Sequence, residues 1–209
     1  MEGGAGSFKK HVTYVENNTC KLMGMVCRIS RGSFNRAWVA KLGWEKIILP
    51  GLLYGLEAIV LNKGQVERLE KLQLRMARWI LGVSRGVAKE VLWGELGWPT
   101  IQDYIDIRRL NFDIHLREMK EEWWHRTLWE EGRLEGKKAG NWERETDEVA
   151  KRCLWNRKEG KSVEVCTKLI KKVVMERSEK EWKKGMEGKS TLKCYKSKKV
   201  GGGGVLKNS

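Results

Sequence analysis

Apolar residues recur with a helical period along most of the chain, and the clearest example runs from Gln65 to Leu81. When each residue is rotated by about 100° from the one before it, the apolar side chains of this segment fall on one side. Gly82 follows directly and is well placed to end a helix. The pattern predicts an amphipathic helix whose buried side is formed by Val66, Leu69, Leu72, Met76, Ala77, Ile80 and Leu81.

The opposite side of this predicted helix carries a narrow row of basic residues, at about one cation per helical turn. One interpretation is a solvated basic face, with Glu67 and Glu70 alongside it. The other is a row of cations that follows the phosphate backbone of a nucleic acid. The row consists of Arg68, Lys71, Arg75 and Arg78.

The segment before it, from Ile47 to Leu61, is almost wholly apolar around Pro50. Because it contains Glu57 and is shorter than the roughly 20 residues that a membrane span needs, it predicts no membrane crossing. A run this apolar has no evident side for solvent, so we expect it to form the buried centre of the fold.

Helical spacing also predicts a helix from Phe8 to Ile29, and a second helix capped by Ser33 with Phe34, Trp38 and Leu42 on one face. We interpret Trp38 and Trp44 as core or core-edge residues. Thr100 can cap a further helix, from Ile101 to about Lys120. In that helix His115 is interpreted as a core histidine, and the carboxylates as ion-pair partners rather than metal ligands: Asp103, Asp106 and Asp113.

Residues 121–160 mix acidic, basic and tryptophan residues. Exposed tryptophans beside arginines would suit stacking on a single strand. We favour a second interpretation, in which they are anchors of short helices whose normal partners are absent from this chain. A last helix is expected from Val163 to about Lys184, with Cys166, Leu169, Ile170 and Val173 inward. The sequence GKST at 188–191 lacks the first glycine of a phosphate-binding loop, because Lys183 occupies its position.

The composition favours an all-α protein, because helix-forming residues dominate and the only prolines are Pro50 and Pro99. We predict an irregular helical bundle of about six to eight helices with a flexible basic C-terminal tail. The predicted parts are a helical domain at 8–120, a Trp- and Lys-rich helical appendage at 121–199 and a flexible tail at 200–209.

The net charge of +15 favours a polyanion as partner, and residues 161–209 hold 14 basic but only 5 acidic residues. The five cysteines form no CxxC pair and the three histidines complete no zinc pattern, so we expect free thiols, an intracellular location and no cofactor. Further candidate backbone-binding residues lie on the last helix: Lys168, Lys171, Lys172, Lys183 and Lys184.

Three segments together resemble the region that follows the polymerase core in LINE-type (non-LTR) retrotransposon reverse transcriptases. They read ILPGLLYGLEA, VERLEKLQLRMARWILGV and LWGELGWPTIQDYIDIRRLNFDIHL. The upstream SFKKHVTYVENNTCKLMGMVCRIS and the late KKGMEGKSTLKCYKSKK resemble flanking stretches of the same region. The resemblance spans about residues 8–199 and rests on the order and spacing of these segments.

The resemblance implies helices that grip template and primer backbones beside a polymerase domain. The sequence has no Asp-Asp pair, so it lacks the carboxylates with which a polymerase holds two metal ions. We therefore expect a non-catalytic fragment of an RNA-directed DNA polymerase that binds RNA or DNA backbone in the nucleus or cytoplasm, with the missing polymerase domain as a further partner. The alternative is a helical scaffold or protein-interaction module. A third hypothesis, binding to a membrane surface, is less favoured because the basic tail has no amphipathic helix with a large apolar face.

Overall fold

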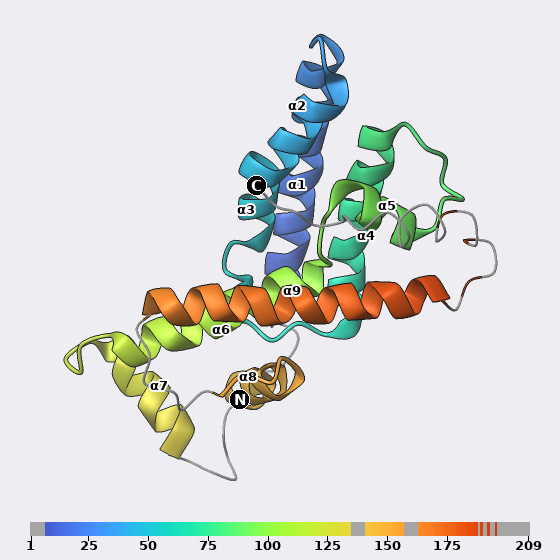
Figure 1. Cartoon of the computed structure of the whole chain (residues 1–209). Helices are drawn as coiled ribbons and strands as arrows, with labels where there is room; N and C mark the ends of the chain where they lie inside the picture. Colours follow the sequence, from blue (N-terminus) through green and yellow to red (C-terminus); the bar gives the residue numbers. More distant parts are fainter. Residues whose placement is uncertain are drawn as a thin grey trace. The chain divides into compact units, whose positions relative to one another are not determined.

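The computed structural model of the chain describes residues 7–134, 141–156 and 163–187, together with Lys189, Leu192 and Tyr195. Its regular elements are helices, and no strand occurs among these residues, which confirms the all-α prediction (Figure 1). The contacts divide the chain into two units. Unit 1 contains the described residues of 1–54, 62–101 and 178–209, and unit 2 contains those of 55–61 and 102–177.

The expected parts at 8–120 and 121–199 stay a prediction. The contacts group the described residues differently, since α6 (Ile101–Glu118) belongs almost wholly to unit 2. The last helix, α9 (Val163–Glu187), contributes its residues up to Arg177 to unit 2 and the later ones to unit 1. The expected flexible tail at 200–209 lies outside the described residues.

Unit 1 begins with a hairpin of α1 (Ser7–Arg31) and α2 (Arg36–Gly43), which lie side by side in Figure 1. The two helices approach closely because residue 43 is a glycine: a Cβ there would lie 2.6 Å from Cγ1 of Val26. Asn35 caps α2, because its side chain accepts a hydrogen bond from the Trp38 N–H at 3.0 Å. The prediction that Ser33 is the cap is wrong, since its hydroxyl donates to the Ser30 carbonyl instead.

The chain continues from α2 through a π-helical turn, η1 (Trp44–Ile48), into α3 (Leu49–Leu53). The hydrogen-bonding pattern changes here just before Pro50, which has no N–H to donate to the preceding turn. The buried side of this segment includes Ile48, Leu52 and Leu53, as expected for the centre of the fold. The prediction that it has no solvent side is wrong, because Ile47 and Tyr54 are 54% and 73% exposed.

The next helix, α4 (Lys63–Leu81), ends at Leu81 as predicted but begins two residues before the predicted start at Gln65, because Asn62 is its cap. Asn62 and Gln65 form a reciprocal capping box, with hydrogen bonds of 2.9 and 2.8 Å between each side chain and the other backbone N–H. Gly82 ends the helix with φ of +67°, a conformation that glycine adopts without strain. The expected apolar side is confirmed as buried at Leu69, Leu72, Met76, Ala77 and Ile80.

A tryptophan pair lies at the core of unit 1. Trp44 is fully buried and stacks on Trp98, with ring centroids 5.4 Å apart. The indole N–H of Trp98 donates to Glu45 at 2.9 Å, so the polar edge of this ring is satisfied. The core interpretation is thus confirmed for Trp44 but wrong for Trp38, which is 61% exposed because its side of α2 faces away from the core.

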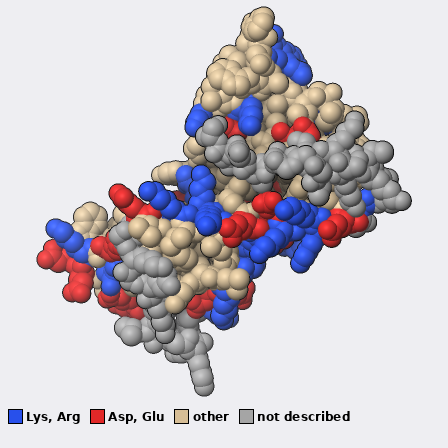
Figure 2. Space-filling model, in the orientation of Figure 1, with Lys and Arg blue, Asp and Glu red and all other residues tan. Residues whose placement is uncertain are grey.

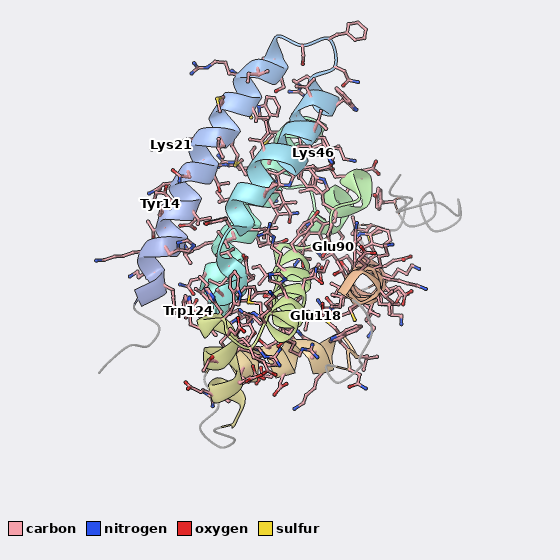
Figure 3. All side chains as sticks on the ribbon, turned by 90° about the vertical axis from the view of Figure 1, so that its left-hand side faces the viewer. Tyr14, Lys21, Lys46, Glu90, Glu118 and Trp124 are labelled. Carbon is pink, nitrogen blue, oxygen red and sulfur yellow. The ribbon has the colours of Figure 1, made fainter. Side chains whose placement is uncertain are left out.

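The short helix α5 (Lys89–Leu96) holds the described end of the chain within unit 1. Glu90, labelled in Figure 3, is buried and accepts a hydrogen bond from Lys189 Nζ at 2.7 Å, while its carbonyl accepts one from the Trp182 indole at 2.7 Å. The Tyr195 hydroxyl donates to Glu95 at 2.9 Å. These contacts fix part of the lysine-rich segment that follows α9.

Unit 2 is built around the inner side of α6, with α7 (Trp124–Leu134), α8 (Asn141–Arg152) and the first part of α9. Trp142 packs its edge against Phe112 at 6.1 Å and donates to the Glu57 carbonyl at 2.8 Å. Trp129 is buried and donates to Asp113, whereas Trp123 and Trp124 are exposed. The core of the unit consists of Leu110, Ile114, Val149, Ala150, Cys153, Cys166, Ile170 and Val174.

The carboxylates of α6 are buried and paired, which confirms their interpretation as ion-pair partners. Asp103 and Asp106 accept hydrogen bonds from Arg177 at 2.6 and 2.9 Å, and Arg152 reaches Asp106 at 3.1 Å. Burial lowers the pKa of Arg177, but the hydrogen bond that it donates to Asp103 and the charge of Asp106 outweigh burial, so the pKa is raised. His115 is exposed on the other side of α6, so its prediction as a core histidine is wrong.

No helix in the part of the chain that the structure describes combines the length and apolar character needed to cross a membrane.

Candidate nucleic-acid interface

The basic row of α4 does not lie on an isolated outer surface, because α1 runs beside it in unit 1 (Figure 1). Arg68 meets Glu16 of α1 through two hydrogen bonds, one of them 2.8 Å between Nε and Oε1. A bidentate pair of this kind neutralises the guanidinium charge. Arg68 is therefore not the free cation that the sequence pattern predicts.

Arg75 lies two turns further along α4 and also faces α1, but its partners there are sulfur atoms. Its Nη2 lies 3.1 Å from Sγ of Cys20 and 3.7 Å from Sδ of Met23. Thiol and thioether sulfurs are weak acceptors and carry no opposing charge here. The positive charge of Arg75 is thus held in position without being neutralised.

Cys27, one turn after Met23 on α1, lies among three arginines. Burial raises the pKa of its thiol, while the charges of Arg31, Arg75 and Arg36 act in the opposite direction. These arginines come from the end of α1, from α4 and from the start of α2 respectively. Three helices therefore direct cations toward one place.

Arg36 is held on the α4 side of the hairpin. Its guanidinium lies 4.9 Å from the centre of the Trp79 ring, a cation–π contact that leaves the N–H edges of the guanidinium available. One of its nitrogens would also lie 3.3 Å from a Cβ at position 82, where the chain has Gly82. The end of α4 and the start of α2 are therefore neighbours in unit 1.

Lys71 and Arg78 complete the basic side of α4. Lys71 is exposed, and Nε of Arg78 is buried without an acceptor among the described residues. Within the described chain, no carboxylate pairs with these two residues or with the three arginines around Cys27. We call this surface the α1–α4 face, and it consists of Arg31, Arg36, Lys71, Arg75 and Arg78.

The sequence pattern of α4 alone does not reveal Arg31 and Arg36. A signal for them does exist in the sequence, because no acidic residue occurs between Glu16 and Glu45. That interval includes the whole turn between α1 and α2. Its basic residues are Lys21, Arg28, Arg31, Arg36 and Lys41, and Figure 3 shows Lys21 on the outer side of α1.

The lysines of α9 have a different setting. Lys168, Lys171 and Lys172 are exposed in unit 2, and Lys183 and Lys184 are exposed in unit 1. Lys183 pairs with Glu179 at 2.8 Å, one turn before it. Figure 2 shows acidic and basic side chains mixed along this helix, so its local field is weaker than that of the α1–α4 face.

Acidic groups that could serve a metal-dependent reaction do not converge in the described part of the chain. No group of three or more Cys, His, Asp or Glu side chains there is arranged to hold a metal ion. Asp103, Asp106 and Asp113 are engaged by arginines instead.

The α1–α4 face thus defines a helical protein with a concentrated cationic surface. No family model, curated protein or solved structure matches the chain. The resemblance to the region that follows the polymerase core in LINE-type reverse transcriptases therefore stays a prediction from the sequence.

Proposed function

We propose that the protein is a helical module that binds the phosphate backbone of RNA or DNA through the α1–α4 face. The observation that carries the proposal is that Arg75 of α4 lies against Cys20 and Met23 of α1 and Arg36 lies over the Trp79 ring of α4, with no carboxylate partner for either arginine among the described residues. Cations at this density attract a polyanion over a Debye length, about 8 Å at physiological salt. The module has no catalytic step of its own and corresponds to the post-polymerase region of a LINE-type reverse transcriptase.

The chemistry of the face favours recognition of backbone rather than of bases. Lys71 is exposed and Arg78 half-buried on the basic side of α4, and long cationic side chains there supply charge without a fixed donor pattern. Binding of this kind is independent of sequence and depends steeply on salt. In this proposal the protein acts in the nucleus or the cytoplasm, on RNA or DNA, with the exposed lysines of α9 adding attraction.

A second candidate function is a scaffold that binds another protein. It is favoured by exposed apolar residues on the hairpin and on the segment after it, including Met25, Ile29, Ile47 and Tyr54. Figure 2 shows mainly uncharged side chains on the face over α2. Nucleic-acid binding and protein binding would then use different sides of unit 1.

The test is a triple variant, Lys71→Gln, Arg75→Gln and Arg78→Gln, which leaves the Arg68–Glu16 pair intact. Gln keeps helix propensity, so we expect each substitution to change stability by about 0.5 kcal/mol or less. Affinity for a DNA duplex should fall for every sequence alike. The slope of log K against log salt should become shallower by up to roughly 2.7, which corresponds to three phosphate contacts.

The matched control removes three other exposed lysines, one from η1, one from the start of α4 and one from the turn after α6: Lys46→Gln, Lys63→Gln and Lys120→Gln. It changes the net charge by the same amount but leaves the α1–α4 face unchanged. Equal salt slopes for the triple variant and the control would show that only net charge matters, and the proposal would be wrong.

A further inference from the structure

The turn between α1 and α2 presents two aromatic rings to solvent. Phe34 is fully exposed and Trp38 is 61% exposed. Phe34 directly precedes the cap residue Asn35, a position from which an apolar side chain often packs back onto the first turn of its helix. Its full exposure shows that Phe34 makes no such contact, so neither ring contributes to the core.

These rings are next to the cations of the α1–α4 face. Arg31 ends α1, three residues before Phe34, and Arg36 begins α2, two residues after it. Arg36 faces α4, where it lies over the Trp79 ring. Since two positions on a helix differ by about 200°, Trp38 points to the opposite side of α2. Trp38 and Arg36 are therefore on opposite sides of α2, and Phe34 is fully exposed in the turn before it.

We propose that this apex binds single-stranded nucleic acid, with phosphates on Arg31 and Arg36 and bases stacked on Phe34 and Trp38. The inference rests on the proposed backbone-binding function and adds the class of strand that the site selects. Aromatic rings stack on bases of any sequence, and a cationic groove beside them follows the backbone. The absence of acidic residues from 17 to 44 makes the whole apex complementary to a polyanion.

The two-sided geometry of the apex favours a single strand over a duplex. A duplex is stiff, with a persistence length of about 150 base pairs, and its bases are already stacked on each other. It can lie along the cations but offers no free base to Phe34 or Trp38. A single strand is flexible enough to cross the apex and contact both sides. Because residues 17–44 include no acidic residue, the apex also favours a single strand of nucleic acid over an apolar protein segment as its partner.

The experiment compares a single-stranded oligonucleotide of mixed sequence with its duplex, by fluorescence anisotropy at fixed salt. In the full chain, Phe34→Leu and Trp38→Leu remove the aromatic faces but keep apolar side chains. Both positions are exposed, so folding should be unaffected, and a thermal melt followed by circular dichroism checks this. Single-strand affinity should fall by roughly fivefold or more for each ring removed, while duplex affinity stays unchanged.

The conservative pair Phe34→Tyr and Trp38→Phe keeps two aromatic faces and should restore single-strand affinity. Unchanged single-strand affinity in the leucine variants, or an equal loss for strand and duplex, would overturn the inference. In either case the proposed function still stands if the triple variant at Lys71, Arg75 and Arg78 lowers the salt slope. A wild-type protein that binds neither oligonucleotide would overturn both.

Discussion

The ion pair between Arg68 and Glu16 offers a test in which affinity should rise rather than fall. Glu16 is the carboxylate that contacts the basic row of α4, and its side chain is 14% exposed against 42% for Arg68. The substitution Glu16→Gln removes the negative charge but keeps an oxygen that can accept a hydrogen bond from the guanidinium. Arg68 then becomes a fourth unneutralised cation on α4, one turn before Lys71.

The expected size of the effect follows from the number of phosphates contacted. One additional contact steepens the slope of log K against log salt by about 0.9 on duplex DNA. The affinity advantage of the variant over the wild type should therefore shrink by roughly 3.5-fold between 50 and 200 mM salt. The loss of stability should be small, roughly 0.2–1 kcal/mol, because Arg68 is partly exposed to solvent.

The assay is anisotropy of a labelled duplex at four or more salt concentrations, with urea unfolding of the same samples to measure stability. The control is Glu118→Gln, a substitution at an exposed residue that ends α6 and is labelled in Figure 3. It changes the net charge equally but belongs to unit 2, whereas α4 belongs to unit 1. If only the net charge mattered, both variants would gain the same affinity for the duplex.

A Glu16→Gln protein that binds no more tightly than the Glu118→Gln control, at any salt concentration, would refute the reasoning. So would higher affinity with an unchanged salt slope, because added phosphate contacts must appear in that slope. Either result would mean that the basic row of α4 is a solvated face.

Two further predictions concern unit 2. Arg177→Met leaves Asp103 and Asp106 buried without their shared partner, so we expect a loss of roughly 3–5 kcal/mol in the free energy of unfolding by urea. Arg152→Met, whose side chain is 43% exposed, should cost about 1 kcal/mol or less, and equal losses would contradict this ranking. Burial raises the pKa of Cys153 to about 11, so the folded state holds the thiol proton more tightly than the unfolded chain. That stabilisation is fully present below about pH 9 and is lost as the pH rises toward 11. Unfolding measured from pH 8 to 11 should therefore show a steeper decline for the wild type than for Cys153→Ala, and parallel curves would count against it.

Local sequence determined where α4 begins and ends. The limits of α4 follow from the capping box of Asn62 and Gln65 and from Gly82, which are short-range features. The apolar period determined which side of that helix is buried, at Leu69 and Met76 among others. The basic side was equally evident, so part of the candidate interface could be predicted from α4 alone.

Only the tertiary structure decided which neighbouring helix packs against each side of a given helix. Trp38 and Trp44 lie on one continuous helical segment, yet one is exposed and the other fully buried, because only one side of it faces the core. Likewise, Arg68 is neutralised by Glu16, 52 residues earlier in the chain, while Arg75 meets only sulfur atoms. Periodicity places a residue on a side of its own helix, but it does not identify the helix packed against that side. The state of each charge depends on that neighbour, because Coulomb attraction acts between residues that folding brings within a few ångströms of each other.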